Sequence, residues 1–230
     1  MGAAVLSFPE QIPASALEAS RTLQPSFTLE RFAGRLIELS ALGASAASSF
    51  TFLLVHEAQR AGEPVAWVLL GEATFYPPDV AAAGIDLNAL PIIRVSKSAD
   101  AGRAATHLLR SGAFGLIVLD LGAESAVPTA LPVPLQSRLE GLARKHDTAV
   151  VCLTRRGAEG GSLGPLISWR GEAHRQSRQG RQWGDLITHR DKRGGSVSRL
   201  SVDFNGPEGV DFNGPLGLDF NAPKGTGEHP

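Results

Sequence analysis

The sequence contains very little cysteine, and this and other absences exclude several classes of protein. Cys152 is the single cysteine among 230 residues, so the chain forms no internal disulfide and no cysteine-based zinc site. Such cysteine usage is typical of a reducing compartment, and we expect a cytoplasmic protein. No run approaches the roughly 18 apolar residues of a membrane span, and the first residues lack the basic and apolar regions of a signal peptide.

Recognisable catalytic and metal-binding motifs are also missing. The six histidines are scattered along the chain without the spacing of metal ligands. There is no Gly-x-Ser-x-Gly motif and no convincing pairing of a nucleophile with a base. The residues therefore indicate no enzyme class, no metal and no cofactor.

Charge is nearly balanced overall but unevenly distributed. The net charge is −1, yet residues 152–199 contain ten Arg and Lys against four Asp and Glu, so the rest of the chain carries −7. A basic segment predicts contact with an anionic partner such as nucleic acid, or with a protein filament. The other interpretation is a solvated surface, or one that pairs with acidic groups of another subunit. The candidate contact residues are Arg155, Arg156, Arg170, Arg175, Arg178, Arg181, Arg190, Lys192 and Arg193.

Apolar runs alternate with helical patterns as far as residue 153. Strands are predicted at 34–39, 65–70, 92–95, 116–119 and 148–153, with helices at 47–61, 78–84, 98–111 and around 135–142. Strands that are apolar on both faces and alternate with helices predict an α/β fold, with a mostly parallel sheet covered by helices on both faces. Beyond residue 153, candidate strands without intervening helices predict an antiparallel extension of the sheet; they lie at 165–169, 186–190 and 197–204.

Three stretches of the chain resemble RecA, in the same order and at similar spacings. GRLIEL at 34–39, the loop after it and a helix ending EAQRAG at 57–62 resemble the segment around the RecA phosphate loop. AAAGIDLNAL at 81–90 resembles the stretch after the second RecA strand, and HLLRSGAFGLIVLDLGA at 107–123 resembles the segment that ends in the Walker B aspartate. The resemblance implies a RecA-like three-layer core at 30–205, between an N-terminal segment at 1–29 and a Gly/Pro-rich tail at 206–230.

The matching phosphate loop departs from the family pattern. That pattern is G-x-x-x-x-G-K-[ST], because glycines let backbone amides wrap the phosphates and the lysine neutralises them. Here Ala41 and Ala46 stand at the glycine positions, Ala47 stands at the lysine position, and Ser48 remains at the hydroxyl position. Ser48 fits a metal-binding hydroxyl or, more simply, a small polar N-cap of the following helix.

Two carboxylates near this degenerate nucleotide site also have two interpretations each. Glu72 adjoins the position that matches the catalytic glutamate of RecA, and it also fits a plain surface carboxylate. Asp120 matches the Walker B position, and it also fits a polar residue at the end of a strand. Because the lysine is missing, we expect no ATP turnover; the alternative is a diverged RecA-family ATPase or recombination mediator with a rebuilt site.

A short RecA-like chain with a decayed phosphate loop resembles the inducible-mutagenesis protein A (ImuA) family. The resemblance implies a non-catalytic accessory role in bacterial DNA damage tolerance, within SOS-type mutagenesis and translesion synthesis. It also implies partners: RecA, a catalytically inactive Y-family-like polymerase homologue, an error-prone C-family polymerase, and DNA. Residues 154–162, TRRGAEGGS, match the region of a DNA-contacting loop in RecA.

The C-terminus contains three tandem repeats: VDFNGPEG at 202–209, VDFNGPLG at 210–217 and LDFNAPKG at 218–225. Units this short and rich in glycine and proline do not bury a core of their own. One interpretation is a repeated linear motif whose aromatic side chains bind a partner, with avidity raised by repetition. The other is a tail without a role that arose by slippage. The candidate partner-binding residues are Phe204, Phe212 and Phe220.

Overall fold

The predicted α/β class is confirmed by the structure, a computed structural model that describes residues 27–71, 75, 80, 84–122, 131–157, 159–178, 181–194 and 198–203. Of residues 178, 181 and 203 it describes the backbone alone. The strands are β1 (Leu36–Ser40), β2 (Val65–Leu70), β3 (Ile92–Val95), β4 (Leu116–Asp120), β5 (Ala149–Thr154), β6 (Trp169–Arg178), β7 (Arg181–Asp191) and β8 (Arg199–Asp203).

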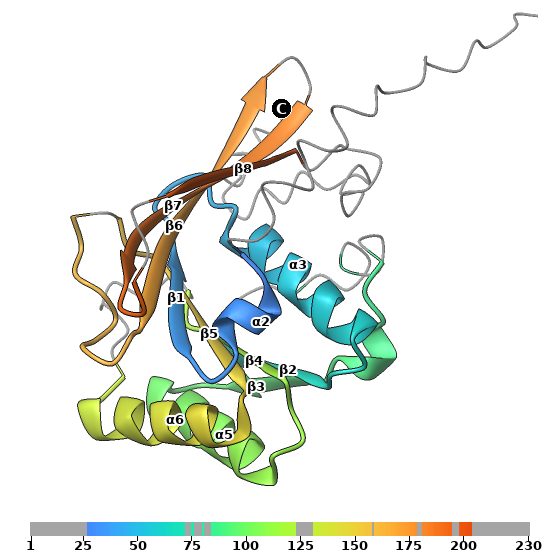
Figure 1. Cartoon of the computed structure of the whole chain (residues 1–230), viewed down its shortest axis with the longest axis vertical. Coiled ribbons are helices and arrows are strands. Elements are labelled where there is room, and N and C mark those ends of the chain that lie inside the picture. Colours follow the sequence, from blue (N-terminus) through green and yellow to red (C-terminus); the bar gives the residue numbers. More distant parts are fainter. Residues whose placement is uncertain are drawn as a thin grey trace, which may run out of the picture.

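These strands form one sheet in the order β3-β2-β4-β5-β1-β6-β7-β8 (Figure 1). The pairs from β3 to β6 are all parallel. β7 is antiparallel to both of its neighbours, β6 and β8. The predicted antiparallel extension at the C-terminal end is therefore confirmed, and β1 lies inside the sheet between β5 and β6.

The helices of the described part of the chain are α2 (Leu29–Phe32), α3 (Ala47–Arg60), α5 (Ser98–Ser111) and α6 (Val133–His146), with a 3-10 turn η2 at Leu87–Ala89. Gly112 ends α5 with φ +67°, a conformation that favours glycine. None of these helices is long and apolar enough to cross a membrane. The predicted helix at 78–84 falls largely outside the described residues, and so do Glu72, Phe204, Phe212 and Phe220.

Alternate side chains of the central strands enter two separate hydrophobic clusters, as expected of buried strands with a period of two. The first cluster joins α3 to one set of strand residues, and its fully buried members include Ile37, Leu39, Phe50, Leu54, Leu69 and Val118. The second cluster joins α5 and α6 to the intervening strand residues, and its fully buried members include Leu36, Val68, Leu109, Ile117, Leu139 and Val150.

The predicted strand at 165–169 is wrong, because β6 begins where that strand was expected to end. Residues 165–168 form a turn and loop, in which the buried side chain of Ile167 joins the second cluster. In β6 the core-facing positions hold Trp169 and Ala173, while charged residues occupy the positions between them. This strand therefore contains no apolar run by which the sequence alone would reveal it.

A buried ion pair closes the sheet at the edge from which β1 starts. Arg35 precedes β1 and Asp191 ends β7; their side chains are both 2% exposed, and Arg35 Nη2 lies 2.5 Å from Asp191 Oδ1. Arg31 Nη2 of α2 lies 2.9 Å from Asp191 Oδ2. Burial alone would raise the pKa of the Asp191 carboxyl, but hydrogen bonds from Arg35, Arg193 N and Arg31 hold it below its ordinary value. The pair ties α2 and β1 to the end of β7.

Candidate functional site at the carboxyl edge of the sheet

The loop between β1 and α3, residues 41–46, lies against β6 at the carboxyl edge of the parallel strands. It is held there like a short additional strand, so its backbone bonds to protein carbonyl and amide groups. Three contacts make this attachment: Ala46 N donates to Ala173 O (3.1 Å), Arg175 N donates to Ala44 O (3.0 Å), and Ser45 forms an antiparallel bridge with His174.

The alanines at the predicted glycine and lysine positions are buried, whereas Ala44 in the middle of the loop is exposed. Ala41 is 3% exposed, Ala46 is 1% exposed and Ala47 is 6% exposed, and the last two belong to the first hydrophobic cluster. Ser48 is half-buried in the first turn of α3, whose N-cap is Ala46, so the predicted N-cap role of Ser48 is wrong. The amide of Ala47 donates to Ser45 Oγ (3.1 Å). Phosphate binding needs free amides and a cation at such a loop. This loop presents methyl groups and no cation.

Asp120 ends β4 at the same edge, between Leu69 of β2 and Leu153 of β5. Burial raises the pKa of its carboxyl above the ordinary value, against the opposing effect of a hydrogen bond from Gly122 N to Oδ1 (3.2 Å). A carboxyl that resists ionisation is a poor ligand for a hard cation. Asp120 thus ends a buried strand, in surroundings that favour the neutral form of its carboxyl.

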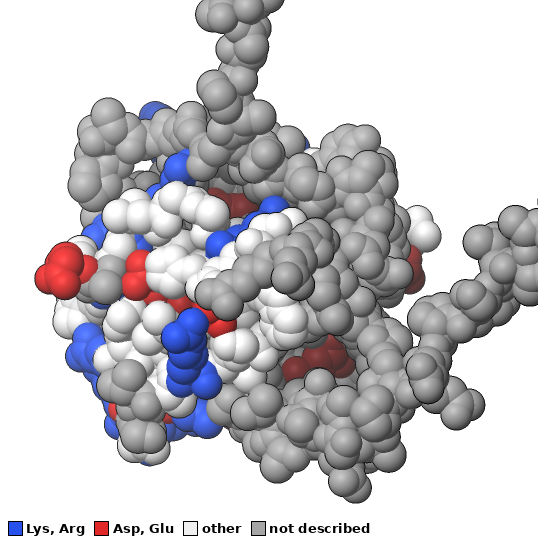
Figure 2. All heavy atoms as spheres, turned by 90° about the horizontal axis from the view of Figure 1, so that it is seen from above, with Lys and Arg blue, Asp and Glu red and all other residues white. Residues whose placement is uncertain are grey.

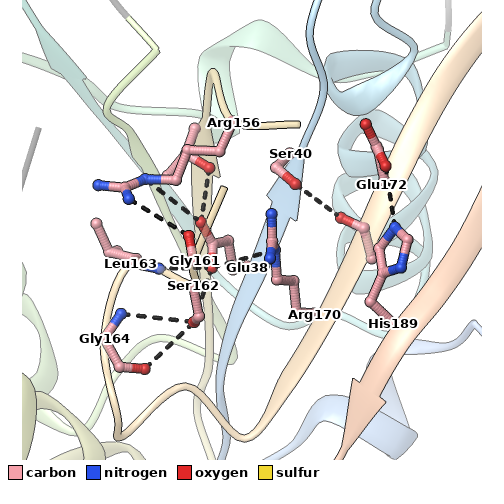
Figure 3. A network of polar contacts seen from close by, with 12 residues as sticks. Glu38, Ser40, Arg156, Gly161, Ser162, Leu163, Gly164, Arg170, Glu172 and His189 are labelled. Carbon is pink, nitrogen blue, oxygen red and sulfur yellow. Dashed lines mark hydrogen bonds and ion pairs between the residues drawn. The ribbon is translucent and has the colours of Figure 1, made fainter. Parts of the chain in front are cut away.

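Glu38 of β1 is the centre of a polar network below this edge (Figure 3). Its side chain is fully buried, and its two oxygens accept hydrogen bonds from two elements that follow β1 by more than a hundred residues. Thr154 Oγ1, at the end of β5, donates to Oε1 (2.8 Å). Ser162 Oγ (3.0 Å) and Leu163 N (2.8 Å), from the loop after β5, donate to Oε2.

Two arginines face the same carboxylate. Arg170 Nε lies 3.8 Å from Glu38 Oε2, and Arg156 Nε lies 3.9 Å from Oε1. Arg170 also donates from Nη2 to Gly157 O (2.7 Å), and Arg156 donates from Nη1 to Gly161 O (3.4 Å). The network therefore joins β1, β6 and the glycine-rich loop after β5, which the resemblance matches to a DNA-contacting loop.

A second carboxylate lies one strand further out. Glu172 of β6 is 6% exposed, and its oxygens meet His189 Nε2 of β7 (2.9 Å) and His174 Nε2 (3.4 Å). Next to it, Ser40 Oγ donates to Gly171 O (3.4 Å), which fixes the end of β1 to β6. Two histidines from the paired strands β6 and β7 thus meet on one carboxylate, although no metal-binding group of three His, Cys, Asp or Glu occurs within the described ranges.

The predicted basic contact residues fall into two groups along the β6–β7 hairpin, and buried Arg170 pairs with Arg190 of the second group. Toward the carboxyl edge lie exposed Arg155, partly buried Arg156 and Arg175, and the backbones of Arg178 and Arg181, which pair where the hairpin turns. Arg190, Lys192 and Arg193 lie at the other end of β7. Nine residue steps along β7 separate Arg181 from Arg190, a distance of about 30 Å, and six steps separate Arg190 from Gly184, the residue that pairs with Arg175. The structure therefore does not bring all nine cations to one patch.

Figure 2 shows the charged side chains on the face seen from above. Among the coloured side chains, Lys and Arg form several separate groups with Asp and Glu between them. The ammonium group of Lys192 makes a hydrogen bond within the protein, because its Nζ donates to Pro165 O. Desolvation, together with nearby Arg190, lowers the pKa of Lys192 below its ordinary value, against the effect of Glu140.

Sequence reasoning missed Glu38, Glu172 and His189. The available signal for Glu38 was a carboxylate inside the apolar run LIEL, because a charge in a buried parallel strand needs partners. Those partners stand 116, 124 and 125 positions further along the chain, so local spacing gives no hint of them. No protein-family model and no curated protein sequence matches this chain at a significant level.

Proposed function

We propose that this chain is a RecA-like protein without ATP turnover, which acts as an accessory factor of bacterial DNA damage tolerance. In this role it contacts RecA, DNA or components of translesion synthesis, as the resemblance to the inducible-mutagenesis protein A family implies. The order of elements supports the proposal, since a strand, a loop and a helix open the sheet and an antiparallel end closes it. A three-layer core with helices on both faces is part of the same proposal.

The observation that carries the proposal is the attachment of loop 41–46 to β6. A phosphate loop joins a strand to a helix and turns its amides toward the ligand. Here the loop occupies that place between β1 and α3, but Ala46 N donates to Ala173 O and Ala47 N donates to Ser45 Oγ. The amides of Ala46 and Ala47 are thus bonded within the protein, and a methyl group stands at the lysine position, so a triphosphate would meet fewer donors and no lysine charge there.

The test combines calorimetry with binding assays on the purified chain. We expect no measurable heat with magnesium and ATP, and retention of RecA or single-stranded DNA in pull-downs at two salt concentrations. Tight uptake of magnesium nucleotide would instead support the alternative of an ATPase with a rebuilt site. A chain truncated after Pro207 tests the C-terminal repeats in the same pull-downs, because unchanged retention would assign them no role in binding.

A further inference from the structure

The glycine-rich loop between β5 and β6 is held at both ends by buried polar groups, while its middle is exposed. Arg170 Nη2 holds the first part through Gly157 O (2.7 Å). Glu38 Oε2 holds the far end through Leu163 N (2.8 Å) and Ser162 Oγ (3.0 Å). Residues 159–161, between these attachments, are exposed. The two side chains that hold the loop are themselves 0% and 7% exposed.

This arrangement is not the one that would maximise stability. A buried ion pair loses much of its Coulombic gain to desolvation, and apolar residues of similar size are often at least as stabilising. The contact between the two charges is also a weak one, because Arg170 Nε is 3.8 Å from Glu38 Oε2 and makes no hydrogen bond with any described residue. The short hydrogen bond of Arg170 goes instead to the loop carbonyl of Gly157. The strongest contacts of both side chains are therefore made with the loop or with its borders.

The loop also lies beside the loop between β1 and α3. Gly157 is so close to the side chain of Leu42 that a Cβ on this glycine would lie 2.8 Å from Leu42 Cδ1. Leu42 is 57% exposed, and Arg155, at the start of the glycine-rich loop, is exposed as well. The position in which Glu38 and Arg170 hold the loop therefore affects how Arg155, a cation, lies relative to the apolar side chain of Leu42 at the carboxyl edge.

We propose that Glu38 and Arg170 are positioning residues, which hold the loop at 155–163 in the conformation that contacts single-stranded nucleic acid without touching the ligand themselves. The ligand part of this inference rests on the proposed function, whereas the attachment of the loop does not. Single strands bind where a cationic groove and stacking or apolar surfaces occur together. A loop ordered before binding also spares the cost of ordering it on the ligand.

The experiment compares Glu38→Gln with the double variant Glu38→Gln/Arg170→Met in the full chain. The single change leaves Arg170 and Arg156 near a neutral group, and we expect a lower Tm. The double change removes one positive and one negative charge together, so we expect the Tm to return toward that of the wild type. In the double variant, amide exchange in peptides covering 157–163 remains about tenfold faster than in the wild type, since charge-assisted bonds to the loop are lost.

Binding of a fluorescent oligothymidine, measured over a range of salt concentrations, supplies the second readout. We expect the double variant to bind about tenfold more weakly, with an unchanged salt slope, because Arg155 and Arg156 remain. A purely structural role predicts that loop protection and affinity recover together with the Tm. The matched control is Arg35→Met/Asp191→Asn, which removes the other buried pair, at the opposite edge of the sheet, and leaves loop exchange and affinity unchanged.

The outcomes separate this inference from the proposed function. If amides 157–163 of the double variant exchange as slowly as in the wild type, the positioning role is overturned. It is also overturned if these amides exchange faster but the affinity for the oligonucleotide is unchanged. A wild-type chain that binds no oligonucleotide at any salt concentration rejects nucleic acid as the ligand, while the exchange rates still decide whether Glu38 and Arg170 hold the loop. A third outcome is that the chain binds no oligonucleotide but binds RecA, and that the double variant binds RecA more weakly. This result would assign the loop to a protein partner instead.

Discussion

Two carboxylates of this protein lie where water does not reach them, and each is surrounded by arginine side chains. Glu38 faces Arg156 and Arg170 within the sheet, and Asp191 faces Arg35 at the other edge. Such groups differ from surface ion pairs, because removal of one partner leaves the other charge buried and uncompensated. At the scale of single residues, we therefore expect substitutions of these buried charged residues to destabilise the fold as strongly as substitutions of large apolar core residues.

Asp191→Asn should lower the free energy of unfolding at neutral pH by about 3 kcal/mol, because Arg35 loses its buried counter-charge. The pKa of Asp191 is lowered in the folded protein, so the folded state binds its proton less readily than the unfolded chain, whose Asp has a pKa of about 3.9. This contribution to stability is complete above that value and is lost as the pH falls through the folded pKa. Urea titrations between neutral and acid pH measure both effects.

The control for this variant is Glu140→Gln, which removes an exposed pair with Arg144 (3.7 Å). We expect a change within about 0.5 kcal/mol, since surface pairs contribute little. The wild type should lose more stability between neutral pH and pH 3 than Asp191→Asn does. Equal losses in the two proteins would show that Asp191 is not a source of the acid sensitivity.

At the scale of elements, the central strands could be predicted from the sequence and the outer ones only in part. VAWVLL and LIVL are continuous apolar runs because β2 and β4 are covered on both faces. β6 reads WRGEAHRQSR, in which small or apolar residues alternate with charged ones, so neither its start nor its length is evident. The site shows the same limit, since the contacts of Glu38 depend on how distant strands pair. From the sequence alone, the alanines of loop 41–46, Asp120 and the arginines at 156 and 170 could be named as candidates, but not the carboxylate of Glu38 that the two arginines face.

The packing of β6 can be tested by a substitution at Gly171, with Gly141 of α6 as a position where a side chain has room. A Cβ on Gly171 would lie 2.3 Å from Trp169 Cη2 and 2.8 Å from Leu186 Cδ1, and Trp169 is 1% exposed. Gly171→Ala should therefore cost about 1–3 kcal/mol in unfolding free energy, measured by urea denaturation. Gly141 of α6 has no atom within 4 Å of such a Cβ, and Gly141→Ala should stabilise by about 0.5–1 kcal/mol through helix propensity. Equal effects at both positions would contradict this account of the packing.

At the scale of the whole molecule, the β6–β7 hairpin separates two groups of cations that are neighbours in the sequence. Arg175, Arg178 and Arg181 lie toward the carboxyl edge, beyond the end of β1. Arg190, Lys192 and Arg193 lie near the buried pair at the opposite edge. One short single strand of nucleic acid does not engage both groups at once if it follows the loops of the carboxyl edge.

Neutralising the first group as Arg175→Gln/Arg178→Gln/Arg181→Gln should reduce the salt slope of single-strand binding by about two, at roughly 0.7 for each phosphate contact. The same triple change at Arg190, Lys192 and Arg193 serves as the matched control and should leave the slope nearly unchanged. Fluorescence anisotropy at several salt concentrations measures both slopes. A slope that falls only in the second variant would place the nucleic-acid contact at the opposite edge of the sheet.

The attachment of loop 41–46 to β6 has an evolutionary consequence under the proposed RecA-like origin. Restoring a lysine at position 47 would return a positive charge but not the amide of Ala46, which donates to Ala173 O. Restoring glycine at position 46 would allow the backbone to turn, but without the lysine there would still be no charge for a phosphate to meet. Under the proposed RecA-like origin, regaining triphosphate binding would require several changes that bring no advantage one at a time, so a loss of that activity would not be easily reversed.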